Sequence, residues 1–224
     1  MYSLEHKKYL KKIKTTSILV HTVQIVIIVA IIAVWQIAAN NEWINTFIYS
    51  SPRAILGTIG DLYQDGTLFH HIGVTFYEVI LSFILGTIIG VVTASILWRF
   101  KFLSRVVDPY LTILNSLPKV SLGPVIIIIA GAGVKSIILM ALFISVIVTI
   151  INVHQAFIST DSNKIKLLES FKATRSQIFF KLIWPSNFRN MVSTFKVNLG
   201  VVFIGVIMGE FLVPKAGVGY LIMY

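Results

Sequence analysis

Ionisable side chains inside long apolar runs are the residues of this sequence best suited to chemistry. Lys119, Glu210 and Glu78 lie within or near the ends of stretches that are otherwise almost wholly hydrophobic. A charge at membrane depth is costly, so each such residue is by default a candidate for function. Lys119 is expected either to attract an anionic substrate or to be satisfied by an internal ion pair or by reaching the membrane surface. Glu210 and Glu78 are expected at an interface or a gate.

No catalytic or nucleotide-binding arrangement is recognisable in the sequence. It has no Gly-x-Ser-x-Gly elbow and no His-Glu-x-x-His helix. The nearest match to a phosphate-binding loop, Gly131 to Ser136, lacks the glycine before Lys135 and follows no predicted strand. There is no cysteine and the five histidines are scattered, so no metal site is expected. We therefore expect that this chain is no enzyme and binds no cofactor itself; if its function uses ATP, a separate ATPase subunit must bind the ATP and Mg.

A polar, basic segment from residue 159 to 190 is the second place where function is expected. It separates two apolar runs, 137–157 and 191–213, and its bases outnumber its acids, which under the positive-inside rule places it in the cytoplasm. Apolar residues recur at helical spacing around Ile165 and again around Ile178, and Pro185 is expected to end the second pattern. Two short amphipathic helices between two membrane spans would form a docking surface.

The composition is that of a polytopic membrane protein. Of the 224 residues, 56% are hydrophobic and 12% are charged, whereas about 25% are charged in soluble domains. The net charge of +10 does not indicate nucleic-acid binding, because the bases cluster at the ends of apolar runs without an aromatic-basic module. We expect an all-α membrane protein whose residues 1–224 form a single transmembrane domain.

Five apolar runs are long enough to cross a hydrocarbon core of about 30 Å as helices. Five lysines in the first 14 residues place the N-terminus in the cytoplasm, and the more acidic residues 40–72 are expected outside. In that outer stretch Ser51 and Pro52 predict the start of an amphipathic helix over about 52–65. The expected spans are about 18–39, 72–98, 106–130, 135–157 and 191–213.

Glycines and prolines predict how these spans pack. The pairs Gly86 with Gly90 and Gly205 with Gly209 have the small-xxx-small spacing that lets helices approach closely. The third span is interrupted by prolines, and broken backbone at membrane depth is tolerated where it is packed in protein or lines a wet cavity. This span is therefore the best candidate for the wall of a substrate pathway. The expected path or gate residues are Asn115, Ser116, Pro118, Lys119, Ser121 and Glu210.

The basic segment resembles the cytoplasmic coupling loop of ATP-binding-cassette (ABC) importer permeases. When the family's spacing is anchored on Pro185, Lys166 stands in place of the family's Glu and Lys172 in place of its Gly. The resemblance covers the chain from about residue 50 to its end. Its flanking motifs are similar to the branch that serves nitrate, sulfonate, taurine and thiamine-precursor uptake: Ser51-Pro52, Asp108-Pro109, Leu117-Pro-Lys119, Leu122-Gly-Pro124, the glycine-rich run 200–211 and Gly217-Val-Gly-Tyr-Leu-Ile222.

This resemblance implies a type I importer permease in the inner (cytoplasmic) membrane. The implied partners are a dimer of ABC ATPase subunits, an extracytoplasmic substrate-binding protein, membrane lipid and a second copy of the permease. Either a sixth helix follows Tyr224, which we favour, or the protein has five spans. At the family's Gly position, either Lys172 is strained at a positive φ or the turn differs. The residues implied in ATPase coupling are Lys166, Glu169, Phe171, Lys172, Ala173, Arg175, Phe179 and Pro185.

Two alternatives to an importer remain open from the sequence. A membrane scaffold or assembly protein, or a degenerate permease in which Lys166 and Lys172 mark lost coupling, would bind partners without moving solute. An ion-coupled transporter would be expected to carry inverted repeats or deep carboxylates, and neither is apparent in the sequence.

Overall fold

The computed structural model describes residues 4–213 and 215–223, and all regular elements in that part of the chain are helical. The chain divides into two compact units, Met1–Leu68 and Phe69–Tyr224. Among the described helices, four are long and apolar enough to cross a membrane: Lys8–Asn40, Leu68–Arg99, Val134–Ile158 and Arg175–Leu212. The prediction of an all-α membrane protein is confirmed, and four of the five expected spans coincide with these helices.

The first unit contains α1 (Leu4–Asn40), α2 (Thr46–Tyr49) and α3 (Pro52–Gln64). The helix predicted over about 52–65 is present, and it begins where the sequence indicates. The Ser51 hydroxyl accepts a hydrogen bond from the Ala54 N–H at 3.2 Å, and Pro52 occupies the first turn, where no backbone donor is needed. The Arg53 N–H donates to Gln36 Oε1 at 3.0 Å, which ties α3 to α1.

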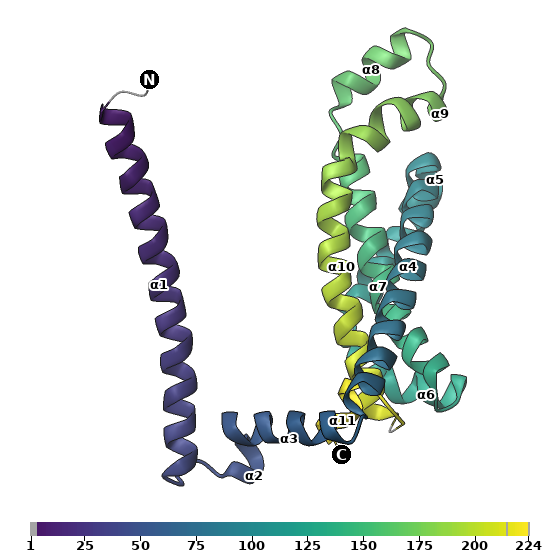
Figure 1. The fold of residues 1–224 in the computed structure, drawn as a ribbon. Coiled ribbons are helices and arrows are strands. Elements are labelled where there is room, and N and C mark those ends of the chain that lie inside the picture. Colours follow the sequence, from purple (N-terminus) through teal and green to yellow (C-terminus); the bar gives the residue numbers. More distant parts are fainter. Residues whose placement is uncertain (1–3, 214, 224) are drawn as a thin grey trace. The chain divides into compact units, whose positions relative to one another are not determined.

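The second unit is a bundle of three long helices with shorter helices at both ends (Figure 1). Its elements are α4 (Leu68–Arg99), α5 (Lys101–Ser116), the 3₁₀ turn η1 (Lys119–Leu122), α6 (Gly123–Ala130), α7 (Val134–Ile158), α8 (Ser162–Ser170), α9 (Arg175–Ile178), the π-helical turn η2 (Phe179–Ile183), α10 (Trp184–Leu212) and α11 (Val218–Met223).

The expected third span, 106–130, is two helices joined by a turn. Leu117 has the extended conformation that a residue before proline prefers, with ψ 141°, so α5 ends at Ser116. The chain then passes through η1 and resumes as α6, with Pro124 in its first turn. The stretch is therefore not among the four long helices, and its prolines are the physical reason.

Helix α7 lies at the centre of the bundle, between α4 and α10. Of the candidate spans it has the largest buried share, 56% of its most apolar window. On its α4 side, Gly86 packs against Ser145 and Gly90 against Thr149; a Cβ added at Gly90 would lie 2.5 Å from the Thr149 Cβ. The predicted close approach at this glycine pair is confirmed.

The second glycine pair brings α10 equally close to α7. A Cβ at Gly205 would lie 2.9 Å from the Ala141 Cα, and a Cβ at Gly209 would lie 2.9 Å from the Ile137 Cγ2. Along α7 the four contacted residues, at 137, 141, 145 and 149, are spaced four apart and form one seam. Small residues on this seam let van der Waals contact hold the helices together without a hydrophobic driving force from lipid.

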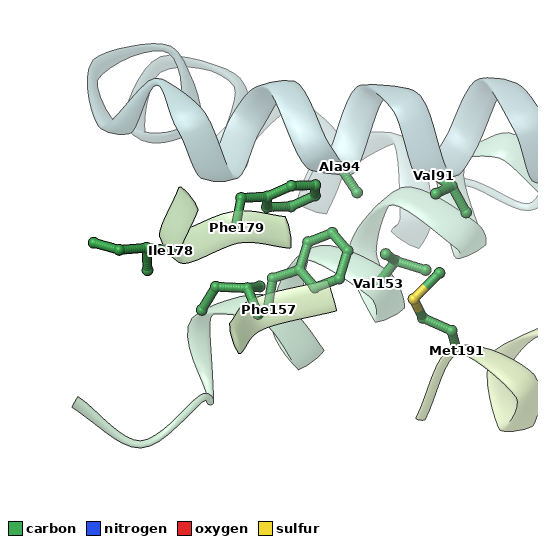
Figure 2. Packing of buried hydrophobic residues seen from close by; sticks show 8 residues of the cluster. Val91, Ala94, Val153, Phe157, Ile178, Phe179 and Met191 are labelled. Carbon is green, nitrogen blue, oxygen red and sulfur yellow. The ribbon is translucent and has the colours of Figure 1, made fainter. Parts of the chain in front are cut away.

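An aromatic core joins the basic segment to the bundle (Figure 2). The ring of Phe179 lies 5.5 Å from that of Phe157 on α7 in an edge-to-face arrangement, and 5.2 Å from that of Trp98 on α4. Aromatic pairs of this kind add about 0.5–1.5 kcal/mol beyond the burial of their surface. The rest of the buried cluster comprises Val91, Ala94, Val153, Ile178, Ile183 and Met191.

Candidate functional site

Helix α8, the first element of the basic segment, is capped at both ends. The Asp161 carboxylate accepts a hydrogen bond from the Asn163 N–H at 2.9 Å. At the other end the Lys172 N–H donates to the Glu169 carbonyl at 2.8 Å, and the Ala173 N–H donates to the Leu168 carbonyl at 3.0 Å. This pair of bonds is a Schellman motif, which needs a left-handed residue just after the helix.

Lys172 is that left-handed residue, with φ +57°. Of the two sequence-based alternatives, the strained lysine is therefore confirmed and the altered turn is wrong. A side chain in this conformation costs roughly 1–2 kcal/mol relative to a right-handed one. The chain thus keeps the turn that a glycine would supply, and the lysine side chain projects exposed from it.

Helix α9 starts with a capping box. The Thr174 hydroxyl accepts from the Gln177 N–H at 3.3 Å, and Gln177 Oε1 accepts from the Thr174 N–H at 2.8 Å. The prediction that Pro185 ends the second amphipathic helix is wrong. The helix passes through η2 and continues as α10 to Leu212. A wider π-helical turn directly before Pro185 accommodates a residue that has no N–H to donate.

Several side chains of the segment face its own bundle. Ile165, Leu168 and Ala173 are partly buried against the aromatic core, and Phe179 is 9% exposed within it. Phe179, which the resemblance implied in coupling, therefore packs inside the chain, where its ring holds the segment in place. It is not part of the exposed face of the segment.

The opposite face of the segment is exposed and mixed in character. Leu167 and Phe171, four residues apart, are 58% and 74% exposed, so two apolar side chains stand together on the outer side. We call this the coupling surface; its exposed residues are Lys166, Leu167, Phe171 and Lys172. Arg175 is also exposed, but it lines a cavity together with Lys101 and Arg105 of α5. Sequence reasoning missed Leu167, although the burial of Ile165 and Leu168 on one face of α8 leaves Leu167 on the other.

The expected path residues fall into two places. Ser116 and Ser121 are exposed around the α5–η1 turn, and their hydroxyls donate to the carbonyls of Ile113 and Pro118 at 2.8 and 2.7 Å. Asn115 and Pro118 are exposed in the same stretch. The Lys119 side chain lies outside the described residues; its backbone begins η1. Asn115, Ser116, Pro118 and Ser121 lie near one another because they are close in the sequence. Glu210 lies elsewhere.

Glu210 is fully buried and holds the C-terminal segment. Its Oε2 accepts from the Gly219 N–H, and its Oε1 accepts from the Thr75 hydroxyl, both at 2.6 Å. Thr75 in turn accepts from the Val218 N–H at 2.8 Å, and His71 Nδ1 accepts from the Gly217 N–H at 3.1 Å. We call this set of bonds the C-terminal clasp.

Only glycine fits at the start of the clasp. Gly217 has φ +112°, and a Cβ there would overlap the Glu210 carboxylate. Sequence reasoning singled out Glu210 but missed Thr75 and His71. The buried carboxylate was the available signal, since such a group must find donors.

Glu78 is the other fully buried carboxylate, three residues after Thr75 and close to Glu210. Neither of its oxygens has a hydrogen-bond partner among the described residues. Ser82, Ser145 and Thr149 also have buried hydroxyls without a partner there. The described residues contain no cluster of three or more metal-ligating side chains.

Comparison with known proteins agrees with this geometry. The family described as "Binding-protein-dependent transport system inner membrane component" matches residues 86–224. A Bacillus subtilis (strain 168) protein assigned to aliphatic sulfonates transport as the permease SsuC is 25% identical over 193 residues, covering 86% of this chain and 70% of that protein. The taurine transport system permease protein TauC of Escherichia coli (strain K12) is 19% identical and covers 90% of this chain and 75% of that protein.

A third relative and a solved structure extend the comparison. The formylaminopyrimidine transport permease protein ThiX of Halalkalibacterium halodurans is 22% identical, covering 85% of this chain and 75% of that protein. A chain of the MetNI methionine ABC transporter in an inward-facing conformation superposes with a TM-score of 0.62 at 19% identity, covering 70% of this chain and 79% of that chain. The fold of the described chain is thus that of an ABC importer permease.

Proposed function

This chain belongs to the family of binding-protein-dependent transport system inner membrane components, and from that premise we propose that it forms the translocation path for a small solute delivered by an extracytoplasmic binding protein. It is the permease component of an ABC importer in the inner membrane, and ATP is hydrolysed by a separate subunit. The proposed solute is a small organic anion or a thiamine-precursor-like compound, because relatives are named for taurine and formylaminopyrimidine transport.

The coupling surface is the proposed contact with the ATPase. Its two apolar side chains, Leu167 and Phe171, can enter a cleft of the partner, while Lys166 and Lys172 supply polar contacts at the rim. On the inner side, the aromatic core packs the segment against α4, α7 and α10. A push on α8 would therefore move the membrane helices as a rigid body. The exposed apolar pair on a braced segment is the observation that carries the proposal.

Lys172 supports a competent segment over a degenerate one. The lysine keeps the left-handed turn that the family's Gly would give, at an energetic cost. The arrangement of α8 and α9 that exposes the coupling surface is therefore kept despite the substitution. We also propose that two copies of the chain enclose the path and that the N-terminus lies in the cytoplasm, in keeping with the basic ends of the membrane helices.

The test is ATP hydrolysis by the reconstituted transporter. The wild-type chain, its candidate ATPase and its candidate binding protein are assembled, and binding-protein-stimulated hydrolysis is measured beside co-purification of the ATPase. Phe171→Ala removes a proposed apolar anchor, so ATPase affinity should fall about 30-fold, as for an interface residue that contributes about 2 kcal/mol. Lys172→Glu should weaken the complex further.

The matched control is Phe47→Ala, which removes a ring that is 96% exposed in α2, outside the coupling surface. It should leave ATPase affinity and stimulated hydrolysis unchanged. If Phe171→Ala and Phe47→Ala are both folded and have the same ATPase affinity, the coupling surface is not the site of ATPase contact.

A further inference from the structure

A basic cavity lies beneath the coupling segment, between the end of α4, the start of α5, the end of α7 and the α8–α9 pair. Its volume is about 320 Å³, several times the roughly 30 Å³ share of one water molecule in the liquid. All four walls belong to the second unit, at the end of the bundle where α8 and α9 lie (Figure 1). The space is therefore large enough for a hydrated phosphate group with substituents.

The charges around this cavity favour an anion. Lys101, Arg105 and Arg175 line it, against the single carboxylate of Glu169. None of the three cations forms an ion pair within the described part of the chain. Asp108, the one acidic residue of α5, does not line the cavity, but it interacts electrostatically with His154 in the cavity wall. Three cations against the carboxylates of Glu169 and the nearby Asp108 still leave a net positive charge.

A hydroxyl and an imidazole complete the polar wall. The Ser104 hydroxyl and His154 Nε2 are 3.2 Å apart, so α5 and α7 are joined across the cavity. Phosphate oxygens readily accept hydrogen bonds from arginine guanidinium groups and from hydroxyl groups. The polar wall thus matches the chemistry of a phosphate ester.

An apolar cavity of about 440 Å³ adjoins the basic one on α4. Trp98 lines both, and the rings of Phe100, Phe180 and Trp184 line the second. Arg99 is also part of this second wall. A small anion would use the basic cavity alone, whereas a molecule with a charged head and an apolar tail would occupy both.

We propose that these two cavities bind one anionic phospholipid, with its phosphate in the basic cavity and an acyl chain along the aromatic one. This proposal rests on the proposed function, because that function sets the orientation of the chain in the membrane. The lipid site requires the α4–α5 connection to lie at the cytoplasmic leaflet. Basic pockets between membrane helices at that leaflet are suited to lipid head groups. The bound phosphate would join Arg175 of the coupling segment to Lys101 and Arg105, so coupling would depend on anionic lipid.

The experiment measures lipid retained by the purified full chain. Native mass spectrometry is run after exchange into detergent with phosphatidylglycerol or phosphatidylcholine, without any ATPase present. The wild type should retain phosphatidylglycerol selectively. Lys101→Gln combined with Arg105→Gln should weaken retention roughly 25-fold, at about fivefold for each cation lost. Phe180→Ala removes an exposed ring from the wall of the apolar cavity and should also weaken lipid retention.

The matched control is Lys164→Gln combined with Lys181→Gln, the same change of charge at exposed positions that line neither cavity. It should retain phosphatidylglycerol like the wild type. If both double variants lose phosphatidylglycerol equally, the lipid is held by the overall surface charge and not by this cavity, and the proposal is overturned. Competition by glycerol phosphate at the same concentration as the lipid would also overturn it, because it would indicate a site for a free anion.

A second measurement separates this proposal from the function it rests on. Binding-protein-stimulated hydrolysis is compared in vesicles of phosphatidylcholine with and without phosphatidylglycerol. Selective lipid retention with lipid-dependent hydrolysis supports the site. Hydrolysis that is independent of phosphatidylglycerol, together with unselective retention, overturns the lipid site but leaves ATPase coupling intact. Displacement of the lipid on addition of the ATPase would assign the basic cavity to the ATPase interface instead.

Discussion

At the scale of single residues, buried polar groups do the work of joining segments that are distant in sequence. Thr75 is the clearest case, because its hydroxyl donates to Glu210 on α10 and accepts from the Val218 N–H at the start of α11. The three elements α4, α10 and α11 thus meet at one oxygen atom. Because Thr75 is buried, the loss of its hydroxyl would leave both hydrogen-bond partners unsatisfied.

Thr75→Val should loosen the C-terminal clasp. The substitution keeps the shape of the side chain but leaves Glu210 Oε1 and the Val218 N–H without a partner, at a cost of about 2 kcal/mol or more. Hydrogen exchange at residues 217–223 should accelerate about 30-fold, whereas exchange on the coupling segment should not change. Thr112→Val is the control, since the Thr112 hydroxyl is exposed and bonds only to the Asp108 carbonyl. Unchanged exchange in the Thr75 variant would mean that the clasp does not hold α11.

Residue-scale strain also marks the coupling segment. Lys172 occupies a conformation that glycine would adopt freely, and the Schellman motif at the end of α8 depends on it. The turn it makes aims α9 back toward the bundle, where Phe179 enters the aromatic core. A single backbone angle therefore sets which side chains of the segment are buried and which form the coupling surface.

At the scale of elements, the seam on α7 determines how the long helices pack. Glycines of α4 and α10 contact it from two sides, and at Gly205 the neighbouring atom is backbone, the Ala141 Cα. A backbone contact cannot be relieved by a change of rotamer. Two helices that meet in this way are sensitive to the addition of one methyl group.

Gly205→Ala and Gly200→Ala should have opposite effects on stability. Both place alanine in α10, and alanine is favoured over glycine in a helix by about 1 kcal/mol. At Gly200 no atom lies within 4 Å of the added Cβ, so this variant should be stabilised. At Gly205 the Cβ would lie 2.9 Å from the Ala141 Cα, so the variant should lose about 1–3 kcal/mol from overpacking.

Thermal unfolding of the purified chain in detergent measures this difference. The unfolding temperature should rise for Gly200→Ala and fall for Gly205→Ala, with the wild type between them. If the two variants shift in the same direction, helix propensity dominates and the seam does not control the packing of α10 on α7.

At the scale of the whole molecule, the long helices of the two units differ in how much of their apolar surface is buried within the chain. None of the most apolar window of the first span is buried, against 33% in α4 and 56% in α7. A helix that is apolar all round needs lipid or another protein against it. The first unit is thus suited to the lipid environment, and the second unit carries the core, the coupling surface and the clasp.

Topology is the whole-molecule property that decides which partners can reach these sites. The chain has no cysteine, so single introduced thiols report accessibility without background. Asp61→Cys in α3 and Lys164→Cys in α8 both replace exposed side chains. In intact cells an impermeant maleimide should label Cys at position 61, while position 164 should be labelled only after the membrane is permeabilised. The reverse pattern would place the coupling surface outside the cell and exclude contact with a cytoplasmic ATPase.

The sequence alone determined the membrane class, four long spans, the helix that starts at Ser51-Pro52, the close approach of both glycine pairs and the left-handed option at Lys172. The option at Lys172 came from the resemblance to the permease family, and the others follow from local properties: the length of apolar runs, capping residues and side-chain size. Pro185 was misread because proline usually stops a helix, and only the neighbouring π-helical turn let it continue.

The tertiary structure alone decided which side chains of each amphipathic helix face inward and which distant groups meet. Periodicity showed that Phe171 and Phe179 each belonged to a helix, but the direction of packing buried Phe179 and exposed Phe171. The clasp joins residues 143 and 135 positions apart, and the basic cavity gathers cations from the α4–α5 connection and from the coupling segment. Such contacts depend on how helices pack in three dimensions, and no spacing along the chain encodes them.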